Sequence, residues 1–148
     1  MPTPFESAQL NLQLFDMRRE AELRKARAWF ILEFHPATSA EYFAAQAGDK
    51  NSWIRMVAGY WDMAASMVVH GAIDQEMFMA AHGEIIGFFS KVHPYLAEMR
   101  GRVGPSVLKH VEAVVMAMPD AEAELVKRAA RLKANWEAKQ VPKAGFLT

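Results

Sequence analysis

Residues 53–74 have the sequence WIRMVAGYWDMAASMVVHGAID, and this stretch decides the fold class. Between positions 53 and 69 almost every residue is apolar or small, which is typical of a helix surrounded by other helices. Gly71 suits the left-handed turn that ends such a helix, and Asp74 suits the first position of the next one. A turn this short makes two successive helices antiparallel neighbours. The stretch therefore predicts an all-α bundle with a central antiparallel helix pair, at about residues 52–70 and 75–93.

The flanking sequence predicts the other helices of the bundle. Thr38 and Glu41 have the spacing of a capping box, so we expect a short helix from there to Gly48. Residues 7–34 favour helix, and the charged segment 16–27 leaves open whether they form one helix or two. An amphipathic helix over 107–118 and an alanine-rich one over 121–139 follow. We expect five to seven helices in a single irregular bundle, one domain over residues 1–148, with a loose tail from about residue 140.

Composition excludes several classes of protein. The chain has 148 residues and no cysteine, which rules out disulfides, thiol nucleophiles and cysteine-based zinc sites. Lysine plus arginine number 17 and so do aspartate plus glutamate, whereas a general nucleic-acid binder needs a basic excess. The apolar fraction of 52% is too high for a disordered chain. We therefore expect a compact helical protein without a nucleic-acid partner.

The sequence contains no recognisable targeting segment. Its first residues, MPTPFES, have neither the basic nor the apolar region of a secretory signal. No stretch approaches the roughly 20 apolar residues of a membrane helix. We expect a cytoplasmic protein without a membrane span.

One polar stripe follows the central helix. Arg55, Asp62, Ser66 and His70 are spaced by seven, four and four residues, and Gly59 falls on the same line. The stripe is most simply explained as a solvent-facing edge, or as polar groups that neighbouring helices satisfy. The alternative is a polar site inside the bundle, where facing helices commonly build ligand or metal sites.

The candidate residues for such a site are Asp62, Ser66, His70 and, from the next helix, His82. A catalytic triad does not fit, because Ser66 lies between the other two and Asp62 is about 12 Å from His70 along a helix. No His-Glu-x-x-His or Glu-x-x-His motif occurs. The sequence therefore predicts no catalytic residue, no metal-ligand set and no cofactor.

Methionine and tryptophan are concentrated around the central helices, at Met56, Met63, Met67, Trp53 and Trp61. Such residues usually fill a core, and methionine also occurs on surfaces that accept varied partners. We expect part of their apolar area to exceed what one small bundle can hide, and an exposed remainder would mark an interface.

The region 59–100 resembles an uncharacterised bacterial family of small all-helical proteins. The resemblance is carried by GYWDM at 59–63, GAID at 71–74, GEI at 83–85, Pro94, and Met99 with Arg100. It implies a helical fold and no established activity, so no catalytic residue carries over. Some family members carry an N-terminal membrane helix, which this sequence lacks.

These observations favour a non-catalytic interaction or regulatory protein that self-associates or binds a protein partner. The alternative is a small-molecule or metal-binding bundle, including an enzyme, that uses the polar stripe. A concave site where Asp62, Ser66, His70 and His82 converge would distinguish the second hypothesis from the first.

Overall fold

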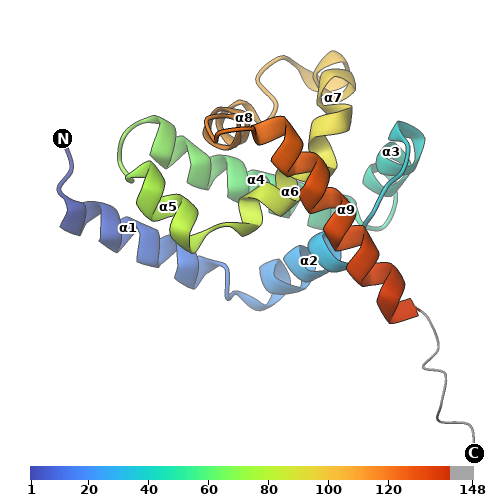
Figure 1. Ribbon diagram of the computed structural model, residues 1–148, viewed down its shortest axis with the longest axis horizontal. Helices are drawn as coiled ribbons and strands as arrows, with labels where there is room; N and C mark the ends of the chain where they lie inside the picture. The colour runs from blue at the N-terminus through green and yellow to red at the C-terminus, as the bar shows by residue number, and fades with distance from the viewer. Residues whose placement is uncertain (141–148) are drawn as a thin grey trace, which may run out of the picture.

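The computed structural model describes residues 1–140 of the chain (Figure 1). Within this range it contains nine α-helices and one short 3-10 segment. They are α1 Pro4–Met17, α2 Ala21–Leu32, α3 Ser39–Ala47, α4 Asn51–Val69, α5 Gln75–Ala81, α6 Glu84–Val92, η1 His93–Tyr95, α7 Leu96–Val103, α8 Lys109–Met116 and α9 Ala121–Gln140. The predicted all-α bundle is confirmed, and the predicted tail lies outside the described residues.

The predicted helix caps form as expected. The Thr38 hydroxyl accepts the backbone N–H of Glu41 at 3.2 Å, and the Asp74 carboxylate accepts that of Met77 at 2.9 Å. Gly71 has a φ of +82°, so the turn between α4 and α5 uses the left-handed conformation that glycine tolerates. These junctions are decided locally, by residues within four positions of one another.

Two helix breaks add to the number of helices: the first lies in the segment where one helix or two were left open, and the second lies where one helix was predicted. Residues 4–32 form α1 and α2, with a turn at 18–20 in which the Glu20 carboxylate caps α2. The predicted helix over 75–93 is wrong as one element, because it is interrupted at His82 and Gly83. Arginine side chains bond the carbonyls at this break: Arg18 donates to Ala81 at 3.3 Å and Arg128 to Gly83 at 3.5 Å. These breaks raise the helix number above the five to seven predicted.

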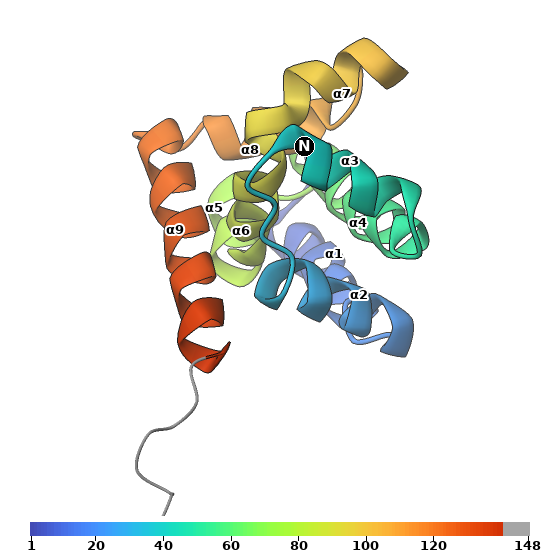
Figure 2. The same cartoon turned by 90° about the vertical axis from the view of Figure 1, so that its right-hand side faces the viewer.

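Helix α4 lies in the middle of the bundle, as its apolar sequence predicts. Ile54, Val57, Trp61, Ala64 and Ala65 are buried on it. Its most extensive contacts are with α8 and α2, whereas α5 packs against α1 and α6 packs against α9 (Figure 2). The chain segment after the Gly71 turn therefore leaves α4 rather than following it as one long antiparallel partner.

The core is a single cluster of buried side chains from most of the helices. Phe30, Phe88, Phe89, Trp61 and Phe78 are among its largest members, and all are completely buried. Burial of this apolar surface provides the main stabilisation of the bundle. Among the helices described, none is long and apolar enough to cross a membrane.

Candidate functional site

The Asp62 carboxylate caps helix α8. It accepts the backbone N–H groups of His110 and Val111, each at 3.1 Å, and lies 3.0 Å from His110 Nδ1. Helix α8 has no side-chain cap of its own, because its N-cap residue is Leu108, whose side chain has no hydrogen-bond acceptor. The carboxylate of the polar stripe is thus occupied by a neighbouring helix. His110, which belongs to no motif in the sequence, completes this contact.

Ser66 and His70 make contacts mainly within α4. The Ser66 hydroxyl donates to the carbonyl of Met63 at 2.6 Å, and His70 Nδ1 lies 2.8 Å from the carbonyl of Ser66. His70 is exposed, with its ring 5.7 Å from that of His110. These residues lie on the α8 side of α4.

His82 lies elsewhere, completely buried at the break between α5 and α6. Its ring contacts those of Phe78 and Trp61, at 4.8 and 6.0 Å between centroids. Its Nδ1 atom lies 3.2 Å from the Arg18 guanidinium, so this nitrogen accepts and Nε2 carries the proton. No hydrogen bond links it to Asp62, Ser66 or His70 within the described part of the chain.

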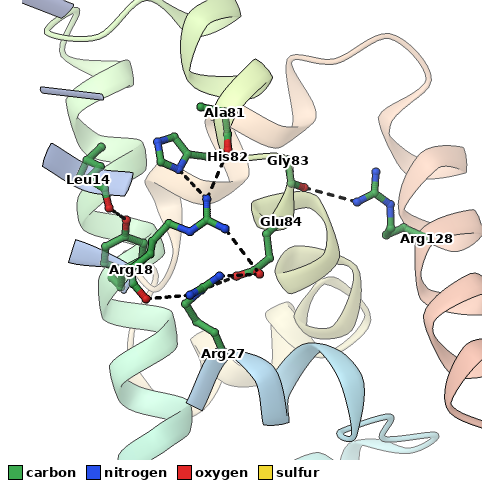
Figure 3. A network of polar contacts seen from close by, with 9 residues as sticks. Leu14, Arg18, Arg27, Ala81, His82, Gly83, Glu84 and Arg128 are labelled. Carbon is green, nitrogen blue, oxygen red and sulfur yellow. Dashed lines mark hydrogen bonds and ion pairs between the residues drawn. The ribbon is translucent and has the colours of Figure 1, made fainter. Parts of the chain in front are cut away.

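A buried polar network surrounds this break (Figure 3). Arg27 makes a two-bond ion pair with the Glu84 carboxylate, at 2.7 and 2.9 Å, and Arg18 approaches the same carboxylate at 3.8 Å. Arg27 also donates to the carbonyl of Arg18 at 2.9 Å. The side chains of Arg18 and Arg27 are only 13% and 12% exposed. One carboxylate therefore serves two arginines and ties α1 and α2 to the start of α6.

Burial changes the acid–base properties of this network. Burial, and then the charge of Arg18, lower the pKa of His82 to about 4. Burial likewise raises the pKa of Tyr60 to about 12. The Tyr60 hydroxyl donates to the carbonyl of Leu14, at the end of α1. At neutral pH both side chains are therefore uncharged, and their polar atoms hold α1 in place.

The network was not predicted from the sequence. Arg18 and Arg27 belong to the charged segment 16–27, which by itself is equally typical of a solvated helix face. The one available signal was the GEI motif at 83–85, which carries Glu84. Among residues 1–140, no group of three histidine, aspartate or glutamate side chains is arranged to hold a metal ion.

Helix α1 presents an apolar face to solvent. Phe5, Leu12 and Phe15 are 69%, 70% and 46% exposed. The side that packs inward carries Ser7 and Asn11 along with Leu14. The Ser7 hydroxyl donates to the carbonyl of Ala72 at 3.0 Å, and the Asn11 amide donates to that of Met77 at 3.4 Å. This helix is thus anchored by two polar contacts together with Leu14 in the core and Leu10 against it, and it leaves Phe5 and Leu12 exposed.

The fold and this arrangement define an irregular all-α bundle with a buried arginine–glutamate network at a helix break. A family model matches residues 4–118, so the chain belongs to the family described as a domain of unknown function, DUF4760. The match confirms the resemblance to an uncharacterised helical family and extends it beyond residues 59–100. Searches of curated proteins and of solved structures each found no match.

Proposed function

We propose that this chain is a non-catalytic interaction protein that self-associates through the exposed face of α1. The observation that supports this most directly is the exposure of Phe5 and Leu12, beside which Phe15 is half-exposed while its ring also contacts His82 and Arg18. Exposed apolar side chains that are grouped, rather than scattered, mark contact surfaces. In Figure 1, α1 lies at the edge of the molecule, where a second chain could approach it.

The spacing of this face favours a helix as the partner. Phe5, Ala8, Leu12 and Phe15 follow one another at intervals of three, four and three residues. These are the intervals of the a and d positions of two heptads, which place side chains on one narrow seam for packing against another helix. We call these four residues the α1 seam.

The α1 seam is complementary to a second copy of itself. If two α1 helices pack antiparallel, Phe5 of one chain faces Phe15 of the other, and Ala8 faces Leu12. Small residues then oppose large ones, whereas a parallel pair would place Ala8 against Ala8 and leave a gap. An antiparallel pair also gives the closed two-fold symmetry that most homodimers have.

The buried network supports this proposal by fixing α1 before any partner binds. Arg18 at the end of α1 is held by Ala81, His82 and Glu84, while Ser7 and Asn11 hold the earlier turns. A surface that is already rigid loses less conformational entropy on association.

The alternative, a ligand or metal site on the polar stripe, has less support. The Asp62 carboxylate is engaged by α8, and His82 lies in a different part of the bundle. No arrangement among the described residues favours this second function over the first. The expected cytoplasmic location stays a prediction, with which the lack of cysteine is compatible.

The experiment is sedimentation velocity on the full chain over a range of concentrations. A seam of two heptads is short, so we expect a weak dimer of the 16.6 kDa chain, with a dissociation constant of roughly micromolar or higher. Leu12→Glu places a charge in the seam and should weaken the dimer at least about tenfold. Val103→Glu is the matched control, because Val103 is 76% exposed on α7. A monomer at all concentrations, or equal weakening by both variants, would contradict the proposal.

A further inference from the structure

A groove runs along α9 where this helix meets α6 and η1. It comprises two adjoining cavities of about 470 and 180 Å³, which share Ser90, Pro94 and Ala129 in their walls. The larger cavity extends to Glu122, and the smaller one extends to Lys133. The groove therefore covers a length of about 16 Å along α9, at roughly 1.5 Å per residue.

The larger cavity forms the apolar end of the groove. Leu125, Val126, Ala129 and Pro94 provide most of its wall, and Val126 is 72% exposed. His93 also lines this end, and its Nε2 atom is buried without a hydrogen-bond partner in the described structure. An exposed valine above an apolar wall is a place where an apolar chain could be removed from water.

The smaller cavity forms the cationic end. Its wall contains Lys91, Lys133 and His35 and no carboxylate, and Glu137 lies one turn beyond Lys133 on α9, near His35. The Lys91 ammonium is held in place, since it donates to the carbonyls of Phe30, Ile31 and Phe34 at 2.6–2.7 Å. Burial lowers the pKa of Lys91 to about 7, so its charge is partial at neutral pH. Lys133 is exposed at the rim and therefore provides most of the positive charge of this end.

The opposite end of the groove carries the opposite charge. Glu122 borders the apolar cavity and is exposed. An anionic group is therefore repelled at that end and attracted at the lysine end. The charges of the two ends give any elongated anion one preferred direction.

We propose that this groove binds a carboxylate with a long apolar tail, of the fatty-acid class. Its carboxylate lies beside Lys133, and its tail lies over Leu125 and Val126. Lys91 adds to the attraction through its charge alone, because its three protons are already donated to carbonyls. This binding site is independent of the α1 seam, which lies on other elements.

The test is calorimetric titration of the full chain with dodecanoate, below the concentration at which dodecanoate forms micelles. We expect saturable binding of one dodecanoate per chain. Lys133→Glu should weaken it at least about tenfold by reversing the charge at the cationic end. Lys139→Glu is the matched control, because Lys139 is exposed on the last turn of the same helix and lies outside the groove walls. The affinity of the Lys139→Glu variant for dodecanoate should stay within about twofold of that of the wild type.

Two further measurements test the apolar wall and the charge preference of the groove separately. Ala129→Trp fills the part that the cavities share and should abolish binding, with circular dichroism as the check on folding. Dodecyltrimethylammonium has the same tail and the opposite charge, so it should bind far more weakly than dodecanoate.

The proposal is wrong if dodecanoate does not saturate, if both amphiphiles bind equally, or if Lys133→Glu retains the affinity of the wild type. It is also wrong if a second copy of the chain occupies the groove. In that case the chain would form a dimer through the groove, this dimer would not bind dodecanoate, and Val126→Glu would dissociate it.

Discussion

Glu84 is the carboxylate on which two nearly buried arginines depend. Replacing it with glutamine keeps the size of the side chain but leaves Arg18 and Arg27 without their counter-charge. We expect Glu84→Gln to lower the free energy of unfolding by about 2–3 kcal/mol, toward the low side of the range for broken buried pairs because the site is partly solvated. Urea denaturation measures this. Glu98→Gln removes an exposed ion pair to Arg102 and should change the same quantity by less than about 1 kcal/mol. If Glu84→Gln and Glu98→Gln lowered the free energy of unfolding equally, burial would not be what makes the Glu84 ion pairs important for stability.

His82 makes the stability of the fold depend on pH. The unfolded chain takes up a proton on this side chain near pH 6.5, whereas the folded chain takes it up only near pH 4. Between these values the unfolded state binds more protons, so acidification favours unfolding. We expect this group to lower the free energy of unfolding by about 3 kcal/mol between pH 7 and pH 4. The charged neighbours of His82 are Arg18, Arg27 and Glu84.

Urea denaturation at a series of pH values measures that loss. His82→Gln removes the titrating ring, so its stability should vary less over the same pH range. His70→Gln changes an exposed ring at the end of α4 and should keep the slope of the wild type. Superimposable profiles for His82→Gln and the wild type would show that the proton uptake occurs elsewhere.

The residues of the candidate sites were only partly predictable. Asp62 and His82 were singled out, and both make specific polar contacts, but with partners that no spacing rule identifies. His110 reaches Asp62 across 48 positions, and Arg18 reaches His82 across 64. Sequence patterns describe which residues share a helix face, whereas these contacts depend on how separate helices pack.

At the scale of the element, Asp62 acts as the missing cap of α8. Asp62→Ala leaves two backbone N–H groups at the start of this helix without an acceptor. We expect it to reduce the free energy of unfolding by about 1–2 kcal/mol, as for the loss of a helix N-cap. Asp62→Asn keeps an acceptor oxygen, so its free energy of unfolding should fall by less than that of Asp62→Ala. If Asp62→Ala left stability unchanged, the contact between α4 and α8 would not depend on this carboxylate.

The helix boundaries show which signals are local. The starts of α3 and α5 were predicted because Thr38 and Asp74 cap N–H groups three positions away. The break between α5 and α6 was not predicted, because its carbonyls are bonded by Arg18 and Arg128, 63 and 45 positions away. A break stabilised by distant side chains leaves little trace in its own sequence beyond a glycine.

At the scale of the whole molecule, the polar anchoring of α1 and its apolar outer face form one arrangement. An isolated chain would gain more from burying Phe5, Leu12 and Phe15 than Ser7 and Asn11, by roughly 1.5–3 kcal/mol for each large apolar side chain. The chain instead turns inward the side of α1 that carries Ser7 and Asn11 together with Leu14. The exposure of Phe5 and Leu12 is the observation on which the proposal of self-association through the α1 seam rests.

The orientation of that contact is open to a direct test, because the chain contains no cysteine. In an antiparallel pair, Ala8 of one chain faces Leu12 of the other, close enough for a disulfide to form. We expect an equimolar mixture of Ala8→Cys and Leu12→Cys chains to form the mixed disulfide under mild oxidation well above the 1:2:1 ratio of homodimer, mixed product and homodimer that random pairing gives. Intact-mass spectrometry distinguishes the three products. If the homodimer of Ala8→Cys chains predominated, the two helices would be parallel instead. As a control, Phe15→Glu added to both chains should suppress all three products, because it places a charge in the α1 seam.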